Sequence, residues 1–454
     1  MLLADPTAKV IRGATSKWPA TARRRGLQGS GAGASTAVIV GGGPAGLLAA
    51  LALEGRFERR IVIERGQPSC AAEAPALLFA GCMAPLEDLC PGLPAELVAA
   101  GAVPFDASGD FRWTQRGRTA GGYRTGIEVL AVSRRLLSQV LRRRLDGQPA
   151  VEFHRGSEVV GLDLDDCRDC IRGVFLRPLD SYGARNSGSD ETWIGADLVV
   201  DAGGHRGQSP EWLRHLGLPM PEERVLGRQI AVTIQVFRWR RPEQAPSAAL
   251  LVDAPGGSSA LYPIEEGRWV AMVGARSGFD SRFDPGLAIE QGALAQSLRH
   301  GEALGAARSW RSVRPSRLDF GGGMGRAASG PAGFVALGAS LAAFDPLFDP
   351  GFSVSVATAL ALRRHTGEDY RLLRPARWWR RAQPAIRRAT RAAAIRDLDP
   401  AEGQGQRLLR RALAQAVRRP ALGARVFRVW QLVDRPAGLL LPALYGSLLE
   451  AARG

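Results

Sequence analysis

Residues 37–64, AVIVGGGPAGLLAALALEGRFERRIVIE, are the part of the chain whose structure the sequence constrains most strongly. The apolar, β-branched run at residues 37–40 predicts a short buried strand. Residues 47–53 continue with apolar side chains at helical spacing, and residues 61–63 predict a second strand. A strand, a glycine turn, a helix and a second strand form the first half of an open α/β sheet.

Three glycines after the first strand, Gly41, Gly43 and Gly46, have the G-x-G-x-x-G spacing of a dinucleotide-binding turn. Gly41 allows the tight turn, Gly43 lets the backbone approach a pyrophosphate, and Gly46 lets the helix pack on the strand. The helix N-terminus offers N–H groups and partial positive charge to the anion. Glu64 ends the second strand, where a carboxylate can accept both hydroxyls of an adenosine ribose. A purely structural turn is the alternative, because glycine accounts for 55 of 454 residues.

Two later segments repeat the pattern of a strand followed by a polar or glycine turn. Residues 198–200 predict a buried parallel strand that ends at Asp201, followed by Gly203 and Gly204. Residues 334–337 predict another strand, followed by Gly338 and by a helix that begins at Gly351. The carboxyl ends of parallel strands are where open α/β sheets bind ligands, although an ordinary strand-to-turn exit is the alternative for each segment.

The periodicity changes to two between these segments. Ile230, Val232, Ile234 and Val236 alternate on one face, and two further runs at 261–264 and 269–273 flank Glu265-Glu266-Gly267 as a hairpin. We therefore predict a discontinuous organisation. It consists of a disordered basic leader at 1–35, a dinucleotide-binding domain at 36–105, 131–220 and 311–370, a substrate domain at 106–130 and 221–310, and a helical region at 371–454.

The net charge of +16 is concentrated at the two ends of the chain. Residues 1–35 carry +5 and residues 371–454 carry +13, so the segment between them is close to neutral and a nucleic-acid partner is disfavoured. Contact with a membrane surface or an acidic partner stays open for the basic C-terminal region. We expect prolines to divide this region into short helices: Pro384, Pro400, Pro420, Pro436 and Pro442.

Lysine occurs only at Lys9 and Lys17, so residues 18–454 contain none. Schiff-base and P-loop chemistry are thereby excluded from the body of the chain. The five cysteines are few and no secretory signal is evident, which favours a cytoplasmic protein. Cys167 and Cys170 form a CxxC without a second ligand pair, so we predict a hairpin turn and no metal site.

In their order and spacing, VIVGGGPAG…VIER, DLVVDAGGHRG and ALGASLAAFDPLFDPGFSVSVATALALR resemble the FAD-dependent monooxygenases of the aromatic hydroxylase group, whose FAD domain is of the glutathione-reductase type. Within that group the resemblance is closest to bacterial flavin epoxidases of polyether-antibiotic pathways. It implies an α/β fold with a Rossmann-like FAD-binding domain, an inserted antiparallel substrate domain and a C-terminal helical region. It also implies FAD as cofactor, NAD(P)H and O2 as co-substrates, and hydroxylation or epoxidation of a small molecule.

The resemblance assigns the candidate cofactor-binding residues. It implies that the three turn glycines hold the pyrophosphate, that Glu64 binds the adenosine ribose, that Arg134 approaches the cofactor, and that Asp201 to Gly204 lie behind it. Pro346 would pack against the isoalloxazine ring, and the helix at Gly351 would point at its pyrimidine edge. Arg65 and Gly338 complete the set. No catalytic acid, base or nucleophile is assigned, because the cofactor performs the difficult chemistry.

Two departures from the family pattern concern the same site. Gly338-Ala339 replaces a Gly-Asp pair whose acid binds the ribityl chain, and Glu73-Ala74-Pro75-Ala76 replaces an Arg-His segment that enters the flavin site. A reductase or dehydrogenase of a lipid-like substrate and a non-enzymatic descendant therefore stay open. A flavin halogenase is disfavoured, because that family depends on a lysine.

The substrate is expected to be mostly apolar or aromatic, for example a polyketide- or terpenoid-like alkene. The expected strands of the substrate domain are mostly apolar, and their arginines lie near strand ends: Arg228, Arg238, Arg240 and Arg268. We therefore expect no buried arginine that binds a carboxylate in this domain.

Overall fold

A computed structural model describes residues 35–66, 73–115, 118–179, 191–245, 249–254, 257–276, 300–320, 330–348, 350–366, 374–394 and 420–435. Almost all of the expected leader lies outside these ranges, as do Pro400, Pro436 and Pro442. Residues 287–298, whose apolar spacing predicts a helix that backs the substrate domain, also lie outside them.

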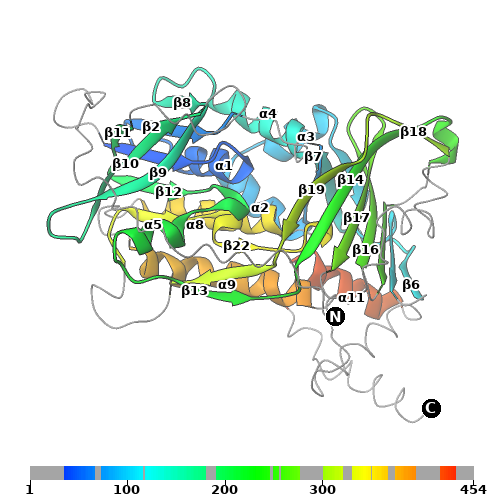
Figure 1. The fold of residues 1–454 in the computed structure, drawn as a ribbon. Coiled ribbons are helices and arrows are strands. Elements are labelled where there is room, and N and C mark those ends of the chain that lie inside the picture. The colour runs from blue at the N-terminus through cyan, green and yellow to red at the C-terminus, as the bar shows by residue number, and fades with distance from the viewer. Residues whose placement is uncertain are drawn as a thin grey trace, which may run out of the picture.

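A five-stranded parallel sheet forms the centre of the fold (Figure 1). Its order is β21-β12-β1-β2-β8, with bounds Phe334–Ala336, Leu198–Asp201, Thr36–Val40, Arg59–Glu64 and Val151–Arg155. The helices α1 (Pro44–Ala52), α4 (Arg134–Leu145) and α8 (Gly351–His365) pack together over it, with α1 in contact with both others. A meander of β9 (Ser157–Leu164), β10 (Ile171–Pro178) and β11 (Thr192–Gly195) contacts β2 and β12. The expected strands of this sheet are confirmed, and Cys167 to Cys170 lie at the β9–β10 turn.

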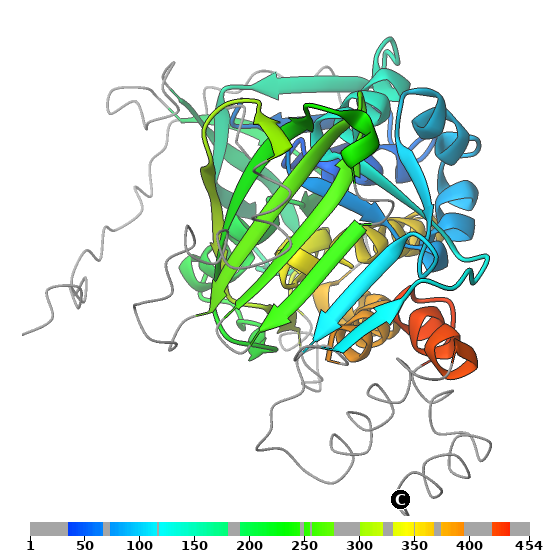
Figure 2. The same cartoon turned by 90° about the vertical axis from the view of Figure 1, so that its right-hand side faces the viewer.

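An eight-stranded sheet lies beside the parallel sheet, and Figure 2 shows it facing the viewer. Its order is β18-β14-β17-β16-β15-β5-β6, and β19 also pairs with β14. The bounds are Gly301–Ala303, Ile230–Trp239, Arg268–Arg276, Gly257–Ile264, Ala249–Ala254, Phe111–Gln115 and Arg118–Gly121, with β19 at Arg308–Val313. The β5–β6 hairpin comes from an early part of the chain and runs along the edge of the later strands. The predicted β16–β17 hairpin across Glu265 to Gly267 is confirmed.

Two small sheets and several short helices connect the large elements. The first sheet, in order β3-β7-β4, contains Pro75–Leu78, Glu128–Ser133 and Val103–Asp106. The second, in order β13-β20-β22, contains Glu222–Val225, Ser316–Asp319 and Ala342–Ala343. The helices are α2 (Ala80–Leu89), α3 (Leu93–Ala99), α5 (Ser209–His215) and the 3-10 turns η2 (Gly204–Arg206), η3 (Pro242–Gln244), η5 (Gly338–Ser340) and η6 (Pro346–Phe348).

The C-terminal helices α9 (Pro375–Ala394) and α11 (Pro420–Trp430) pack against the body. The prediction that Pro384 ends a helix is wrong, because α9 continues through it. Pro384 lies on the exposed side, while Trp378 and Ile386 are buried on the opposite side and hold the helix in place. Trp378 Nε1 also donates a hydrogen bond to the carbonyl of Ala336 at 2.8 Å. Packing of the buried face offsets the hydrogen bond that proline cannot make.

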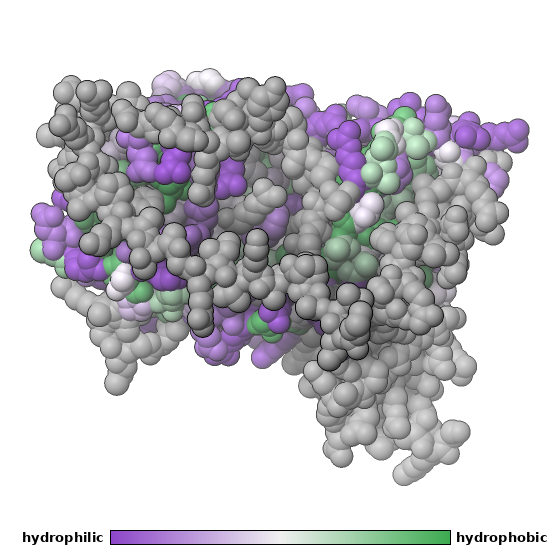
Figure 3. All heavy atoms as spheres, viewed as in Figure 1, coloured by the Kyte–Doolittle hydropathy of each residue, from purple (hydrophilic) through white to green (hydrophobic). Residues whose placement is uncertain are grey.

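Aromatic rings attach α11 to the β5–β6 hairpin. The ring of Trp430 lies 4.9 Å from that of Trp113 and 5.5 Å from that of Phe111. The carbonyl of Gln431 accepts a hydrogen bond from the N–H of Gly81 at 2.9 Å, in the first turn of α2. No helix among the described residues is both long and apolar enough to cross a membrane. In the view of Figure 3, the largest visible group of apolar side chains lies over the large sheet, and smaller groups are scattered elsewhere on this face.

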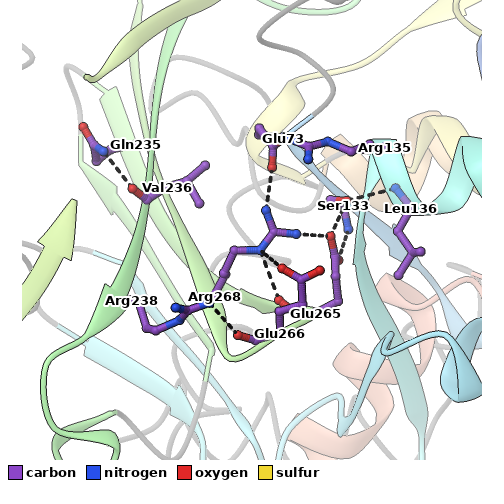
Figure 4. A network of polar contacts seen from close by, with 10 residues as sticks. All are labelled: Glu73, Ser133, Arg135, Leu136, Gln235, Val236, Arg238, Glu265, Glu266 and Arg268. Atoms are coloured by element: carbon purple, nitrogen blue, oxygen red, sulfur yellow. Dashed lines mark hydrogen bonds and ion pairs between the residues drawn. The ribbon is translucent and has the colours of Figure 1, made fainter. Parts of the chain in front are cut away.

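A buried polar network, here called the Glu265 network, joins the large sheet to the start of α4 (Figure 4). Glu265 lies in the β16–β17 turn with a side chain that is only 5% exposed. It accepts hydrogen bonds from the hydroxyl of Ser133 at 2.6 Å and from the N–H of Ser133 at 2.9 Å. Ser133 precedes an apolar run at helical spacing in residues 134–145, a pattern that predicts an N-cap. The Ser133 hydroxyl accepts the N–H of Leu136, which confirms this cap.

Arg268 extends this network to the segment before β3. Its guanidinium donates to Glu265 at 2.6 Å and to Glu73 at 3.1 Å, and Glu73 also pairs with Arg135 of α4. Arg268 lies at the start of β17, as expected, but its side chain is only 11% exposed. Its carboxylate partners belong to the protein itself.

We expect Glu265→Gln to lower the free energy of unfolding by roughly 2–4 kcal/mol, because Arg268 keeps its charge and loses a buried carboxylate. Chemical denaturation measures this. The double variant Glu265→Gln with Arg268→Met should be destabilised by about 1–2 kcal/mol less than the sum of the two single variants.

The matched control is Glu266→Gln in the same turn. Glu266 also pairs with Arg268, at 3.3 Å, but its side chain is 70% exposed. Its removal should change stability by less than about 1 kcal/mol. Equal losses for the variants at 265 and 266 would contradict the view that burial gives the network its strength.

Candidate cofactor site

Three turns lie side by side at one edge of the parallel sheet. β1, β12 and β21 are parallel neighbours, with Val40 opposite Asp201 and Asp201 opposite Ala336. The N–H of Ala202 donates to the carbonyl of Val40 at 2.9 Å, and the N–H of Leu337 donates to that of Asp201 at 2.8 Å. The glycine turn, the segment after Asp201 and the turn at Gly338 therefore begin next to one another.

Gly41 and Gly46 are glycines because the fold requires it. Gly41 has a φ of +111°, and a Cβ on it would lie 2.5 Å from the carbonyl oxygen of Ala202. A Cβ on Gly46 would lie 1.8 Å from the carbonyl oxygen of Gly41. These contacts are backbone-to-backbone, so no side chain can move to relieve them. They agree with the turn and packing roles expected for the two residues.

Gly43 differs from its two neighbours in the motif. Its φ is −79°, which any residue adopts, and a Cβ on it would meet no described atom within 4 Å. Nothing in the described structure therefore requires glycine here. Gly43 is the N-cap of α1; in the described structure no side chain caps that helix and no acidic residue lies in its first turn. Open space beside an uncapped helix N-terminus fits a pyrophosphate.

The start of α8 converges on the same place through Gly338. With a φ of +63°, this glycine lies so close to α1 and α8 that a Cβ would be 2.7 Å from the Cβ of Ala45 and 3.0 Å from Oγ of Ser355. Ser355 Oγ donates to the carbonyl of Gly351, the first residue of α8, at 2.8 Å. Pro346 is buried in η6 just before this helix.

Glu64 lies directly beside the glycine turn, because a Cβ on Gly42 would be 2.1 Å from its Oε2. Arg142 binds it through both oxygens, at 3.2 Å to Oε1 and 2.8 Å to Oε2, and Arg155 donates to Oε1 at 3.1 Å. Oε1 thus has two donors and Oε2 one. A carboxylate oxygen accepts about two hydrogen bonds, so one position on Oε2 is left for a ribose hydroxyl rather than the two positions expected.

Sequence reasoning missed Arg142 and Arg155. Arg142 lies in the last turn of α4 and also covers the ring of Phe153, with 4.6 Å between guanidinium carbon and ring centroid. The one available signal was its place among the three arginines at the end of a helix, which does not identify a partner.

Asp201 has no capacity left for a ligand. It is completely buried, and its carboxylate accepts hydrogen bonds from the N–H of Gly203 at 3.0 Å, from the N–H and hydroxyl of Ser209, and from the hydroxyl of Ser340 at 3.0 Å. All four lone-pair positions are used. Asp201 therefore holds two of the three turns together rather than contacting a cofactor itself.

The other candidates lie around this edge. Arg65 pairs with Glu158 at 2.7 Å. Arg134 is the first residue of α4, and its N–H donates to the carbonyl of Ala74 at 3.0 Å. Gly204, at a φ of +75°, has no described atom within 4 Å of a Cβ position.

The buried thiols near α8 are not nucleophiles at neutral pH. Burial raises the pKa of Cys82 to about 12. Burial likewise raises the pKa of Cys90 to about 11. Both stay protonated. Among the described residues, no group of three or more His, Cys, Asp or Glu could hold a metal ion.

Comparison with known proteins agrees with this geometry. Residues 34–296 match the family described as FAD binding domain. The chain is 28% identical over 356 residues to Protein Rv3254 of Mycobacterium tuberculosis, a match that covers 72% of each chain.

Solved structures show the same fold. The flavin-dependent brominase Bmp2 has a TM-score of 0.65 at 17% identity, covering 92% of this chain and 98% of Bmp2. The p-nitrophenol 4-monooxygenase PnpA of Pseudomonas putida DLL-E4 has a TM-score of 0.59 at 16% identity, covering 88% of this chain and all of PnpA. 2-Methyl-3-hydroxypyridine-5-carboxylic acid oxygenase has a TM-score of 0.57 at 17% identity, covering 82% of this chain and 94% of the oxygenase. With the family match spanning more than half of the chain, this protein belongs to the FAD binding domain family.

Proposed function

We propose that this protein is an FAD-dependent monooxygenase that uses NAD(P)H and O2 to hydroxylate or epoxidise a mostly apolar or aromatic small molecule. The observation that carries the proposal is the open space at Gly43, beside an α1 N-terminus that no described side chain caps. The described structure would accept a larger residue at position 43, whereas a bound pyrophosphate requires glycine there. Glycine at this position therefore supports a binding role over a purely structural turn.

The residues present fit FAD and divide its binding among several elements. Gly43 and the first turn of α1 would bind the pyrophosphate. Oε2 of Glu64, held in place by Arg142, would accept one ribose hydroxyl. The first turn of α8, which has no acidic residue, would lie near the pyrimidine edge of the flavin, where negative charge develops on reduction. Bound FAD would supply the electron transfer from NAD(P)H and the activation of O2.

The protein's own part in the reaction would be to orient the substrate and exclude water. Tyr262 of the large sheet is 1% exposed, and its hydroxyl donates to the carbonyl of Leu347 at 3.1 Å. This contact ties the large sheet to the η6 turn and to Pro346, which would pack against the flavin. A sheet fixed at this turn would keep bulk water from the reacting atoms.

An apolar or electron-rich aromatic substrate is supported by the chemistry of the large sheet. The guanidinium of Arg268, which is 11% exposed, already donates hydrogen bonds to Glu265 and Glu73, which leaves it less able to bind a substrate carboxylate. The names of two structural neighbours contain small aromatic compounds. PnpA is named for p-nitrophenol, and the pyridine oxygenase is named for a hydroxypyridine carboxylic acid. A polyketide- or terpenoid-like alkene is the larger compound that we include in the proposal.

Three alternatives have specific tests. A reductase or dehydrogenase would turn over without oxygen. A non-enzymatic descendant would purify without FAD. Bromination, suggested by the fold of Bmp2, is disfavoured because residues 18–454 contain no lysine, and it would require bromide for product formation.

The experiment is to measure NADH and NADPH oxidation by the flavin-loaded protein against a panel of phenols, phenolic acids and long apolar polyenes, with and without O2. We expect stimulation by apolar or phenolic compounds and one oxygen atom gained in the product by mass spectrometry. Oxygen-independent turnover, or a product that contains bromine, would replace the proposal by one of its alternatives.

Gly43→Val should abolish FAD binding while the protein still folds, because the added side chain occupies open space that only the cofactor fills. Flavin absorbance of the purified protein and its thermal unfolding measure the two effects.

Gly46→Ala is the matched control within the same motif. Its Cβ would meet the Gly41 carbonyl, so it should lose stability by about 3 kcal/mol or more and lose FAD as a consequence. If Gly43→Val kept full flavin content, the turn would not bind the pyrophosphate.

Ala339→Asp should tighten FAD binding by roughly tenfold, because it restores a charge-assisted hydrogen bond to the ribityl chain worth about 1.5–3 kcal/mol. Ala339 is half-buried, so the new carboxylate is not forced into a closed core. Titration of the apoprotein gives the dissociation constant, and Ala339→Asn separates the charge from the added bulk. Unchanged or weaker binding in a folded variant would mean that the site has adapted to alanine.

A further inference from the structure

Helix α9 is divided into a buried apolar face and an exposed basic face. The buried face contains Trp378, Trp379, Ala382, Ile386, Ala389 and Ala392, each at most 2% exposed. The exposed face carries five arginines, here called the arginine stripe: Arg377, Arg380, Arg381, Arg387 and Arg391. At 1.5 Å per residue, the stripe is about 21 Å long.

The stripe has no acidic counterpart on its own helix, because residues 375–394 contain no Asp or Glu. Within the described part of the chain, Arg380, Arg387 and Arg391 make no ion pair with a carboxylate. Arg428 of the neighbouring helix α11 is different, since it pairs with Asp434 at 2.7 Å. Charges of one sign that lie close together repel one another, so an anionic surface that binds Arg380, Arg387 and Arg391 would relieve this repulsion.

The position of α9 leaves the arginine stripe exposed. It also keeps the apolar face of the helix packed on the protein, so this face is not available to enter a lipid bilayer. α9 runs along the lower edge of the molecule, below α8 and on the opposite side from α4 (Figures 1 and 2). Its apolar face is already used, with Trp378 completely buried and hydrogen-bonded to Ala336. The helix can therefore offer a partner its arginines alone.

We propose that the arginine stripe docks this protein on the surface of an anionic phospholipid bilayer. A bilayer surface is flat and its headgroups rearrange, so a straight row of arginines binds it without further shape complementarity. Single-stranded nucleic acid would be expected to use exposed aromatic rings for stacking, whereas both tryptophans of α9 are buried. The proposal is independent of the proposed oxygenase activity, and it would bring the chain close to apolar compounds held in a membrane.

The test is co-sedimentation of the full-length protein with vesicles of phosphatidylcholine alone or with about one-third phosphatidylglycerol. We expect binding to the anionic vesicles alone, and its loss as salt is raised. Arg380→Gln with Arg387→Gln should lower the partition coefficient roughly 25-fold, from about fivefold for each arginine.

Two variants control for charge and for position. Arg380→Lys with Arg387→Lys keeps the charge and should keep the binding. Arg143→Gln with Arg240→Gln removes the same charge from two other exposed arginines, one in α4 and one directly after β14, and should also leave binding intact.

Unchanged vesicle binding by the α9 glutamine variant, or equal binding to neutral vesicles, would overturn the proposal. So would an α9-dependent interaction with a DNA duplex in place of vesicles. Circular dichroism melting checks that every variant is folded, which is expected because all of the substituted side chains are exposed.

Discussion

The approach of the Gly46 backbone to the carbonyl of Gly41 decides where the rest of the cofactor-binding half can lie. A Cβ at Gly46 would be 1.8 Å from that oxygen, so α1 can begin directly at the end of β1 only because both residues are glycine. Gly41 in turn lies against the carbonyl of Ala202, which fixes the exit of β12 relative to the same turn. Helix N–H groups are thereby directed to the sheet edge where three strands end.

Buried carboxylates hold this arrangement together from the inside. Asp201 joins the turn after β12 to Ser340 and Ser209, and Glu265 joins the large sheet to the first residue before α4. Each is nearly or completely buried and has several donors, which is the condition under which a buried charge is tolerated. Since Ser133 caps the helix that carries Arg134 and Arg142, a displacement of the β16–β17 turn would also affect Arg142 and its partner Glu64.

The sequence was informative wherever a short segment determines its own structure. The glycine turn, the Ser133 N-cap and the β16–β17 hairpin depend on neighbouring residues, and Glu266 and Gly267 both have the positive φ that such a turn needs. The arginines that bind Glu64, and the Glu73 partner of Arg268, come from residues far away in the chain, and no local pattern could identify them. Pro384 shows the converse case, because its local effect on a helix is overridden by the packing of Trp378 and Ile386 on the body.

The charges around the site favour one end of the cofactor over the other. The N-termini of α1 and α8 carry about half a positive charge each, and neither first turn contains an acidic residue. Glu64, the carboxylate beside the glycine turn, is offset by Arg142 and Arg155. These features attract a pyrophosphate, whereas Ala339 offers the ribityl chain no side-chain acceptor. Removing one charge-assisted hydrogen bond costs about 1.5–3 kcal/mol. We therefore expect the pyrophosphate to contribute a larger share of the binding free energy here than in relatives with an acid at this position.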